Sequence, residues 1–364
     1  MDHEAFLQEV LTFTEEEEVY RKVYGLRSQP VALKNYFAEI EDYVREHILF
    51  FAEFPFIQIP AVFTDDHFTP RHDLAGTAHA DIVRHLRYTP VFEYSCTFFE
   101  VLYILHGSCG HQLGEEHYTL HQGDLAFIAP GTKRTIEVFD ESVVLSLHIR
   151  RDTFENDFFN ILRGGNLISD FFISSLYSQN PPANMLFPTG DDTEIRDLFL
   201  DLYRESLIND SFSQNLLDNL IPVLFVTLLR RHEKDVIIGR RPLSDPGTGR
   251  MRILSYISDH YQTATLSGTA AAFHYSPEHT TRLIRLETGK GFNAFLRDVR
   301  LGRAQQLLTG SQLSISAISS MIGYENPESF IRVFEKVYGI SPARYRKQPV
   351  WFSEASSGTG MAGS

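Results

Sequence analysis

The chain has 364 residues, a length that predicts two or three domains rather than one. A hydrophobic content of 43% and a charged content of 22% indicate a globular protein with an ample core. No run of about 18 apolar residues is present to cross a membrane, and the acidic N-terminus lacks the apolar segment of a secretory signal. Neither of the two cysteines, Cys96 and Cys109, has a CxxC partner, so we expect a reduced, cytoplasmic chain without a cysteine zinc site.

The net charge of −14 is unevenly distributed along the chain. Residues 247–348 hold 13 Lys and Arg against 7 Asp and Glu, whereas residues 1–246 hold 20 against 39. A basic module joined to an acidic one is typical of a DNA-binding domain fused to another domain. Ordinary surface variation can also give such an excess, so charge alone leaves both explanations open.

Residues 3–55 are predicted to be helical because apolar residues such as Phe6 and Val10, or Phe37, Ile40 and Val44, recur at helical spacing. Residues 56–90 are mixed and interrupted by prolines. Residues 1–90 therefore form an N-terminal helical or irregular extension.

Residues 91–150 change character and predict strands. The short runs 98–105, 124–128 and 143–149 are aromatic or β-branched, and glycines separate them as in consecutive hairpins. We expect a small antiparallel β-barrel or sandwich here.

Helical patterns return at about 152–178 and 192–233, where Pro222 should kink or restart the second helix. We assign residues 151–236 to a helical dimerisation region. A segment rich in Gly, Pro and charge, 237–249, predicts a linker, and the Gly/Ser/Ala-rich tail, 349–364, is expected to be disordered.

Within residues 250–348, two stretches repeat with an offset of 50 residues, 276–289 and 326–339. Each opens with a helix-capping residue followed by Pro and closes on a Gly where a helix should end. Each carries an Arg at the same place, Arg282 and Arg332. A short helix and a tight turn precede each stretch, so the pattern is a helix-turn-helix motif used twice.

In such a motif the N-terminal half of the second helix enters the major groove of DNA. Arg can pair with guanine, Glu can accept from cytosine, and Ile or Pro can touch a thymine methyl group. The side chains expected to face bases are Glu278, His279, Thr281, Arg282 and Arg285 in the first copy, and Pro327, Glu328, Ile331 and Arg332 in the second.

The remaining cations are better placed for phosphate groups than for bases. They are Arg297, Arg300, Arg303, Lys336, Arg344, Arg346 and Lys347. For any single cation a solvated helix face is the simpler explanation, but the repeated context favours base contact for Arg282 and Arg332. For Arg282 and Arg332, a salt bridge with Glu278 or Glu328 remains an alternative role.

One segment of this region closely resembles the signature of the AraC/XylS transcription regulators. The matching residues are Ile315-Ser316-Ala317-Ile318, Gly323-Tyr324, Asn326-Pro327-Glu328-Ser329-Phe330, Arg332-Val333-Phe334 and Gly339-Ile340-Ser341-Pro342. The resemblance covers residues 250–347. It implies two recognition helices that enter successive segments of the major groove, joined by a rigid helix at 292–308.

The first copy departs from the family pattern. Thr269 stands where the family has Leu, Thr280 where it has a large apolar residue, and Ile284 where it has Phe. We therefore expect weaker packing around the first recognition helix.

Residues 91–150 resemble a cupin, the usual sensor domain of this family. Glu100 and Gly107 keep the spacing of the first cupin motif, but Tyr94 and Cys96 stand at its His positions, or Glu93 and Ser95 under the longer spacing. Arg134 replaces the His of the second motif. Three of four metal ligands are therefore missing, which argues against a metal-dependent enzyme. Several His lie nearby and leave another metal site open: His85, His106, His111, His117 and His121.

The resemblance places Tyr94, Glu100, Tyr103 and Arg134 in the barrel interior. Aromatic and polar groups together suit a small polar effector such as a sugar. Alternatively, the protein's own side chains fill the barrel and nothing binds there.

These observations predict an α+β protein, with an N-terminal cupin-like β-barrel with flanking helices and a C-terminal all-α domain with two helix-turn-helix motifs. We expect a cytoplasmic, sequence-specific transcription regulator, an activator by family resemblance, and not an enzyme, with no cofactor. The expected partners are double-stranded DNA, a small-molecule effector, RNA polymerase by resemblance, and a second copy in a homodimer, with no membrane. A cupin enzyme with an accessory DNA-binding domain and a regulator without an effector are the alternatives.

Overall fold

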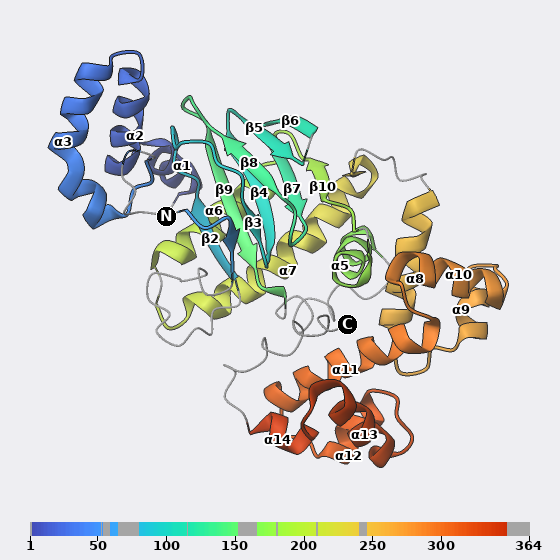
Figure 1. Cartoon of the computed structure of the whole chain (residues 1–364). Helices are drawn as coiled ribbons and strands as arrows, with labels where there is room; N and C mark the ends of the chain where they lie inside the picture. The colour runs from blue at the N-terminus through green and yellow to red at the C-terminus, as the bar shows by residue number, and fades with distance from the viewer. Residues whose placement is uncertain are drawn as a thin grey trace, which may run out of the picture. The chain divides into compact units, whose positions relative to one another are not determined.

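The computed structural model describes residues 2–51, 53, 59–64, 80–114, 116–151, 166–179, 181–208, 210–239 and 246–347. These residues fall into two compact units. The N-terminal unit comprises the described residues up to 151 together with 181–239, and the C-terminal unit comprises 166–179 and 246–347. Figure 1 shows the elements of both units.

Three helices open the N-terminal unit, α1 (His3–Leu11), α2 (Glu15–Leu26) and α3 (Pro30–His47). The start of α2 is a capping box: Glu17 N–H donates to Thr14 Oγ1 while Thr14 N–H donates to the Glu17 carboxylate. Helices α2 and α3 pack around Tyr20, Phe37 and Val44. The predicted helical start of the chain is therefore three short helices.

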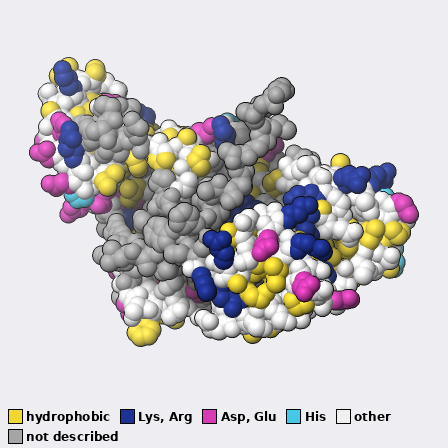
Figure 2. All heavy atoms as spheres, turned by 60° about the horizontal axis from the view of Figure 1, so that its bottom comes forward, with side chains coloured by type: hydrophobic (Ala, Val, Ile, Leu, Met, Phe, Trp, Pro, Cys, Tyr) yellow, Lys and Arg dark blue, Asp and Glu magenta, His cyan; other side chains and the backbone are white. Residues whose placement is uncertain are grey.

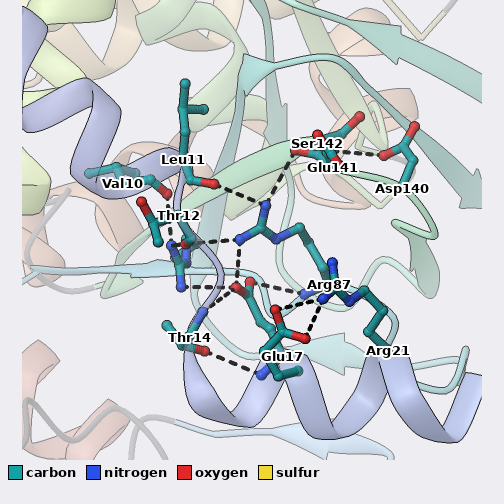
Figure 3. Close-up of polar contacts among 12 residues, drawn as sticks. Val10, Leu11, Thr12, Thr14, Glu17, Arg21, Arg87, Asp140, Glu141 and Ser142 are labelled. Atoms are coloured by element: carbon teal, nitrogen blue, oxygen red, sulfur yellow. Dashed lines mark hydrogen bonds and ion pairs between the residues drawn. The ribbon is translucent and has the colours of Figure 1, made fainter.

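Glu17 also connects these helices to the sheets through hydrogen bonds and ion pairs (Figure 3). Its carboxylate accepts hydrogen bonds from Arg87 at 2.7 Å and Arg84 at 3.1 Å, and all three side chains are buried. The Arg87 guanidinium also donates to the carbonyls of Leu11 and Thr12, which end α1. The buried Glu17 carboxylate therefore connects α2 with residues 84–87, and Arg87 connects both of these to the end of α1.

The strands of the N-terminal unit are mostly antiparallel. They are β1 (Val62–Phe63), β2 (Ala80–Arg84), β3 (Ser95–Cys96), β4 (Phe99–His106), β5 (Ser108–Leu113), β6 (Glu116–His121), β7 (Asp124–Ile128), β8 (Arg134–Glu137), β9 (Val143–Ile149), β10 (Asn184–Pro188) and β11 (Ile237–Ile238). One sheet has the order β11-β10-β7-β4-β9-β2, a second β6-β5-β8, and β1 pairs in parallel with β3.

The two larger sheets face each other around a shared core, to which Leu102, Ile104 and Val144 contribute from one sheet and Cys109 and Ile136 from the other. The expected α+β class and cupin-like architecture are confirmed, in the form of two facing sheets. The predicted limits 91–150 were too narrow, because β2, β10 and β11 complete the larger sheet.

Two helices, α6 (Thr193–Ile208) and α7 (Ser213–His232), cover the other face of the larger sheet, and the short 3-10 helix η3 (Glu233–Asp235) follows them. Phe199 of α6 stacks on Tyr103 with ring centroids 4.3 Å apart, and Phe225 of α7 packs on Phe127. The expected restart at Pro222 was wrong: α7 continues through this residue, whose ring is buried.

The C-terminal unit holds seven helices over residues 246–347, a stretch described without a gap. They are α8 (Pro246–Asp259), α9 (Leu266–Ala272), α10 (Pro277–Thr288), α11 (Phe292–Gly310), α12 (Ile315–Met321), α13 (Pro327–Tyr338) and α14 (Pro342–Arg346). An eighth helix, α5 (Leu167–Tyr177), comes from the chain between β9 and β10 but belongs to this unit. It lies beside α8 in Figure 1.

The predicted helical region 151–236 is therefore divided between the two units and contains the strand β10. The tail 349–364 and residues 240–245 of the predicted linker lie outside the described residues. Within the described part of the chain, none of the helices is long and apolar enough to span a membrane.

Candidate nucleic-acid interface and ligand site

The helices α10 and α13 begin and end in the same way. Ser276 Oγ accepts from the backbone N–H of His279, and Asn326 Oδ1 accepts from that of Glu328, so each cap satisfies a free donor of the first turn. Pro follows at the first helical position in both. Gly289 and Gly339 end the helices with φ of 68° and 73°, a conformation that favours glycine. The sequence repeat is therefore a repeat in backbone structure.

The buried faces of these helices carry the expected core residues. Ile284 in α10, and Phe330 and Phe334 in α13, are fully buried. Thr280 is also fully buried, and its hydroxyl has no hydrogen-bond partner among the described residues. A buried hydroxyl group without a hydrogen bond lowers the stability of the folded state. The first copy therefore carries a destabilising group at the position where we expected weaker packing.

The opposite faces carry the residues predicted to contact bases. Those exposed are Glu278, Arg282, Arg285, Glu328 and Arg332, and those half-buried are His279, Thr281, Pro327 and Ile331. The Arg282 guanidinium donates to the His279 ring at 2.9 Å. No ion pair joins Arg282 to Glu278 or Arg332 to Glu328, so within residues 277–338 the salt-bridge alternative is not realised.

Three of the cations predicted to contact phosphate have structural partners instead. Arg303 is only 9% exposed and donates to Gln306. Arg300 donates to the carbonyls of Tyr261 and Gln262, and Arg346 donates to that of Leu313. Arg300 and Arg346 bind carbonyls of residues far away in the chain, which sequence spacing does not reveal, whereas the partner of Arg303 is three residues away on the same helix. Because these three guanidinium groups are already bound within the protein, we do not include them in the proposed phosphate contacts.

The remaining cations of the set lie on the surface. Arg297 is exposed and paired with its neighbour Asp298. Lys336, Arg344 and Lys347 are exposed, and their side chains form no hydrogen bond or ion pair within residues 246–347. Figure 2 shows Lys and Arg side chains outnumbering Asp and Glu over this unit. The charge asymmetry read from the sequence is therefore expressed on its surface.

A second polar cluster lies inside the N-terminal unit. Glu100 and Arg134 are both buried, and their side chains form an ion pair at 2.5 Å. Burial by itself raises the pKa of the Glu100 carboxyl, but the Arg134 charge and the hydrogen-bond donors around it bring that pKa well below its usual range. The pair is therefore a buried carboxylate and guanidinium that neutralise each other.

Other side chains complete this cluster. Ser146 donates to Glu100 Oε1 at 2.5 Å, and His148 Nε2 lies 3.5 Å from the same oxygen. The Arg134 guanidinium lies over the Tyr94 ring at 4.6 Å and donates to Cys96 Sγ. Burial, with the Glu100 charge, raises the pKa of the Cys96 thiol to about 12, so it remains protonated. Tyr94, Glu100 and Arg134 thus meet as predicted.

Tyr103 was wrongly placed in the interior. Side chains alternate along a strand, so Glu100 and Tyr103, three residues apart, point to opposite faces of β4. Tyr103 packs outside, on Phe199 of α6.

His111 was considered only as a possible metal ligand and proves to be an interior residue. It shares the face of β5 that carries the core residues Cys109 and Leu113. Its Nδ1 lies 2.8 Å from the Thr135 carbonyl, whereas its buried Nε2 has no hydrogen-bond partner among the described residues. Period-two alternation along β5 was the sequence signal that would have identified it, as it would have for Ser146 and His148 on β9.

The donor set does not fit a metal ion. Glu100, the one retained cupin ligand, is bound by a guanidinium, which opposes a cation at the same carboxylate. In the described part of the chain, His, Cys, Asp and Glu form no cluster of three that could hold a metal.

Two family models match this chain. The model described as AraC-like ligand binding domain matches residues 90–224, and the model described as helix-turn-helix domain matches residues 269–348. The matched residues are those of the strand-rich domain and of the paired capped helices, so the chain combines an AraC-like ligand-binding domain with a helix-turn-helix domain. The chain belongs to the AraC/XylS family of transcriptional regulators.

Named relatives include regulators that match only the C-terminal part and others that match most of the chain. The uncharacterized HTH-type transcriptional regulator YijO of Escherichia coli is 34% identical over 97 residues, 26% of this chain and 34% of that protein. An uncharacterized HTH-type regulator of Haemophilus influenzae is 26% identical over 66% of this chain and 83% of its own length. The HTH-type transcriptional activator RhaR of Cronobacter sakazakii is 25% identical over 70% and 87%. With YijO the match spans about a third of the relative's length.

The chain also has similarity to solved structures. The C-terminal domain of AraT, a response regulator from Geobacillus stearothermophilus, is 28% identical, with 30% of this chain and 93% of that chain covered and a TM-score of 0.27. ToxT from Vibrio cholerae O395 is 10% identical, with 74% and 96% covered and a TM-score of 0.29. The family assignment depends on the sequence models and relatives.

Proposed function

We propose that this protein binds a specific DNA sequence through α10 and α13, which read two successive major-groove segments. The observation that carries the proposal is the exposed Arg332, which has no hydrogen-bond or ion-pair partner within the continuously described residues 246–347. An unpaired guanidinium on a recognition helix is ready to bind guanine O6 and N7. Arg282, oriented by His279, has the same role in the first copy.

The other contacts follow from exposure and chemistry. Glu278 and Glu328 accept from cytosine amino groups, while His279, Thr281, Arg285, Pro327 and Ile331 make secondary base contacts. Arg297, Lys336, Arg344 and Lys347 bind phosphate and set the salt dependence.

The ligand-binding domain takes a small, neutral, hydroxyl-bearing effector such as a sugar. His111 Nδ1 faces a carbonyl, so it carries the ring proton and leaves Nε2 as a buried acceptor without a donor. Arg134 Nε is a buried donor without an acceptor among the described residues. A hydroxyl group can satisfy both kinds of atom, and the mutual neutralisation of Glu100 and Arg134 disfavours a charged ligand.

The protein acts as a transcriptional activator in the cytoplasm and engages RNA polymerase. Support for activation comes from its likeness to RhaR, whose name describes a transcriptional activator. An enzymatic role is disfavoured because the relatives are regulators and because the retained cupin carboxylate is paired with Arg134.

The protein forms a homodimer through α7. Phe212, the N-cap residue of α7, and Leu216 and Val223 within the helix lie four and seven residues apart, so they share one face of it. They are 67%, 45% and 49% exposed, an unusual amount of open apolar surface on one helix. A second α7 would bury this face and pair two DNA-binding units.

DNA duplexes recovered from a randomised pool by the full-length protein test the DNA-binding proposal. Fluorescence anisotropy should show that a recovered duplex binds at least about 10³-fold more tightly than a scrambled duplex at physiological salt, with affinity falling as salt rises. Equal affinity for both duplexes would contradict sequence-specific binding.

A thermal-shift screen tests the effector proposal. Among sugars, polyols and their acidic or amino derivatives, neutral compounds should stabilise the wild-type protein and should not stabilise the His111→Phe variant. Stabilisation by the charged derivatives alone would refute a neutral effector.

A further inference from the structure

We infer that α5 is a component of the first helix-turn-helix copy, in which Tyr177 and the contacts of Glu287 position the recognition helix α10. The inference builds on the proposed base contacts of α10. Its evidence is a set of contacts that all lie within the C-terminal unit.

The two copies differ in one part of their cores. In the second copy, Phe334, Tyr338 and Tyr345 form a closed aromatic group with centroid separations of 4.5, 5.4 and 5.8 Å. At the offset of 50 residues, the equivalents in the first copy are Ile284, Thr288 and Phe295. Two of three rings are therefore absent from the first copy.

Helix α5 supplies one of the missing rings. Tyr177, at the end of α5, packs edge-on against Phe295 with centroids 5.3 Å apart, close to the 5.8 Å between Tyr338 and Tyr345. The ring that the second copy takes from its own recognition helix thus comes, in the first copy, from a helix distant in sequence. Aromatic pairs in this geometry stabilise beyond their buried area.

The end of α5 also holds the last turn of α10. Gln179 N–H donates to the Glu287 carbonyl at 2.6 Å, which satisfies a carbonyl that the helix itself leaves free. Ser178 donates to one carboxylate oxygen of Glu287 at 3.1 Å, and Arg250 of α8 binds the other. The equivalent of Glu287 in the second copy is Val337, which is 46% exposed.

The composition of α5 agrees with this role. Nine of its eleven residues are buried, including the fully buried Asp170, whose carboxylate lies 3.7 Å from Arg252 of α8. A helix with so little exposed surface is a core element of the unit that contains it. Since the chain reaches α5 from β9 and leaves it toward β10, the first copy is completed by a segment of the ligand-binding half of the sequence.

Base preferences of full-length variants test the inference. Duplexes are selected from a randomised pool with the wild type, with Arg282→Ala and with Arg332→Ala. Base pairs whose preference is weakened by Arg282→Ala are assigned to α10, and those weakened by Arg332→Ala to α13. Tyr177→Ala should weaken, by about fivefold or more, only the preferences that Arg282→Ala weakens. Tyr177→Phe should restore them, and the matched variant Tyr338→Ala should affect only the preferences assigned to α13.

Equal loss at both sets of base pairs, or an unchanged α10 set, would overturn the inference. If Tyr177→Ala fails to fold, Ser178→Ala removes the side-chain hydrogen bond from the end of α5 to Glu287, and Glu287→Gln removes the negative charge that Ser178 and Arg250 contact. An unchanged α10 set in both variants overturns the inference equally. Hydrogen exchange tests the role of α5 independently of the proposed base contacts. Residues 277–288 should exchange about tenfold faster in Tyr177→Ala while residues 327–338 do not change, even if Arg282→Ala alters no base preference.

Discussion

Replacement of Arg134 by Met should destabilise the N-terminal unit strongly. The substitution keeps an unbranched side chain but leaves the Glu100 carboxylate, which is 3% exposed, without its partner at 2.5 Å. Removing one member of a buried ion pair costs about 3–5 kcal/mol. A domain of this size loses about 2–4 °C of Tm per kcal/mol, so the transition should fall by about 6–20 °C at pH 8.

The loss should depend on pH in a defined direction. In the wild type the pKa of Glu100 is held below its usual range, so its stabilising effect is present above about pH 4.3 and declines only as the pH falls toward the lowered value. In Arg134→Met the Arg134 charge no longer lowers this pKa, and only the Ser146 and His148 contacts oppose the effect of burial. The pKa of Glu100 therefore rises, and the carboxyl binds a proton more readily as the pH falls from 8 to 5. The Tm difference between the two proteins should therefore narrow over that range.

Differential scanning calorimetry between pH 5 and 8 measures both effects. The double variant Glu100→Gln, Arg134→Met is the matched control, because removal of both charges leaves no uncompensated carboxylate and should restore most of the lost stability. A single variant as stable as the wild type at pH 8, or a loss independent of pH, would refute the reasoning.

Four further predictions concern other parts of the chain. Arg87→Met should cost about 3 kcal/mol and speed proteolysis of α1–α3, because Glu17 keeps only Arg84, whereas Arg45→Met, which breaks an exposed pair, should change neither. Arg332→Ala should lower specific affinity by about 1–3 kcal/mol, while Lys347→Ala should weaken binding to all sequences and reduce the salt slope by about 1, both measured by anisotropy. Burial lowers the pKa of His111 to about 4, so effector affinity measured by calorimetry should be constant from pH 8 to 5, and a loss centred near pH 6.5 would contradict a neutral His111 acceptor. Phe212→Asp should convert the proposed dimer to a monomer in analytical ultracentrifugation, whereas Asp at the equally exposed Val31 of α3 should not.

Local signals in the sequence predicted the C-terminal unit well. Capping residues, Pro at the first helical position and terminal Gly act within one turn of a helix, so they mark the ends of α10 and α13 without knowledge of the rest of the fold. The sequence also predicted that Tyr94, Glu100 and Arg134 share a site, because the resemblance to the cupin motifs places all three in the interior between the sheets.

Contacts between distant segments account for the errors. Arg300 and Arg346 look like ordinary surface cations until the carbonyls of Tyr261 and Leu313 are found beside them. The apolar pattern of residues 167–177 predicted a helix but could not show that it joins the C-terminal unit. Tyr103 is different, because the alternation of β4 was sufficient to place it outside and was not applied.

The central claim is that α10 and α13 read separate parts of one DNA site. Selection of duplexes from a randomised pool by wild type, Arg282→Ala and Arg332→Ala tests it directly. We expect two groups of preferred base pairs about one helical turn apart, 10–10.5 bp, each weakened by only one of the substitutions. If both variants recover the same base pairs with the same preferences as the wild type, the two arginines do not read the sequence and the claim is wrong.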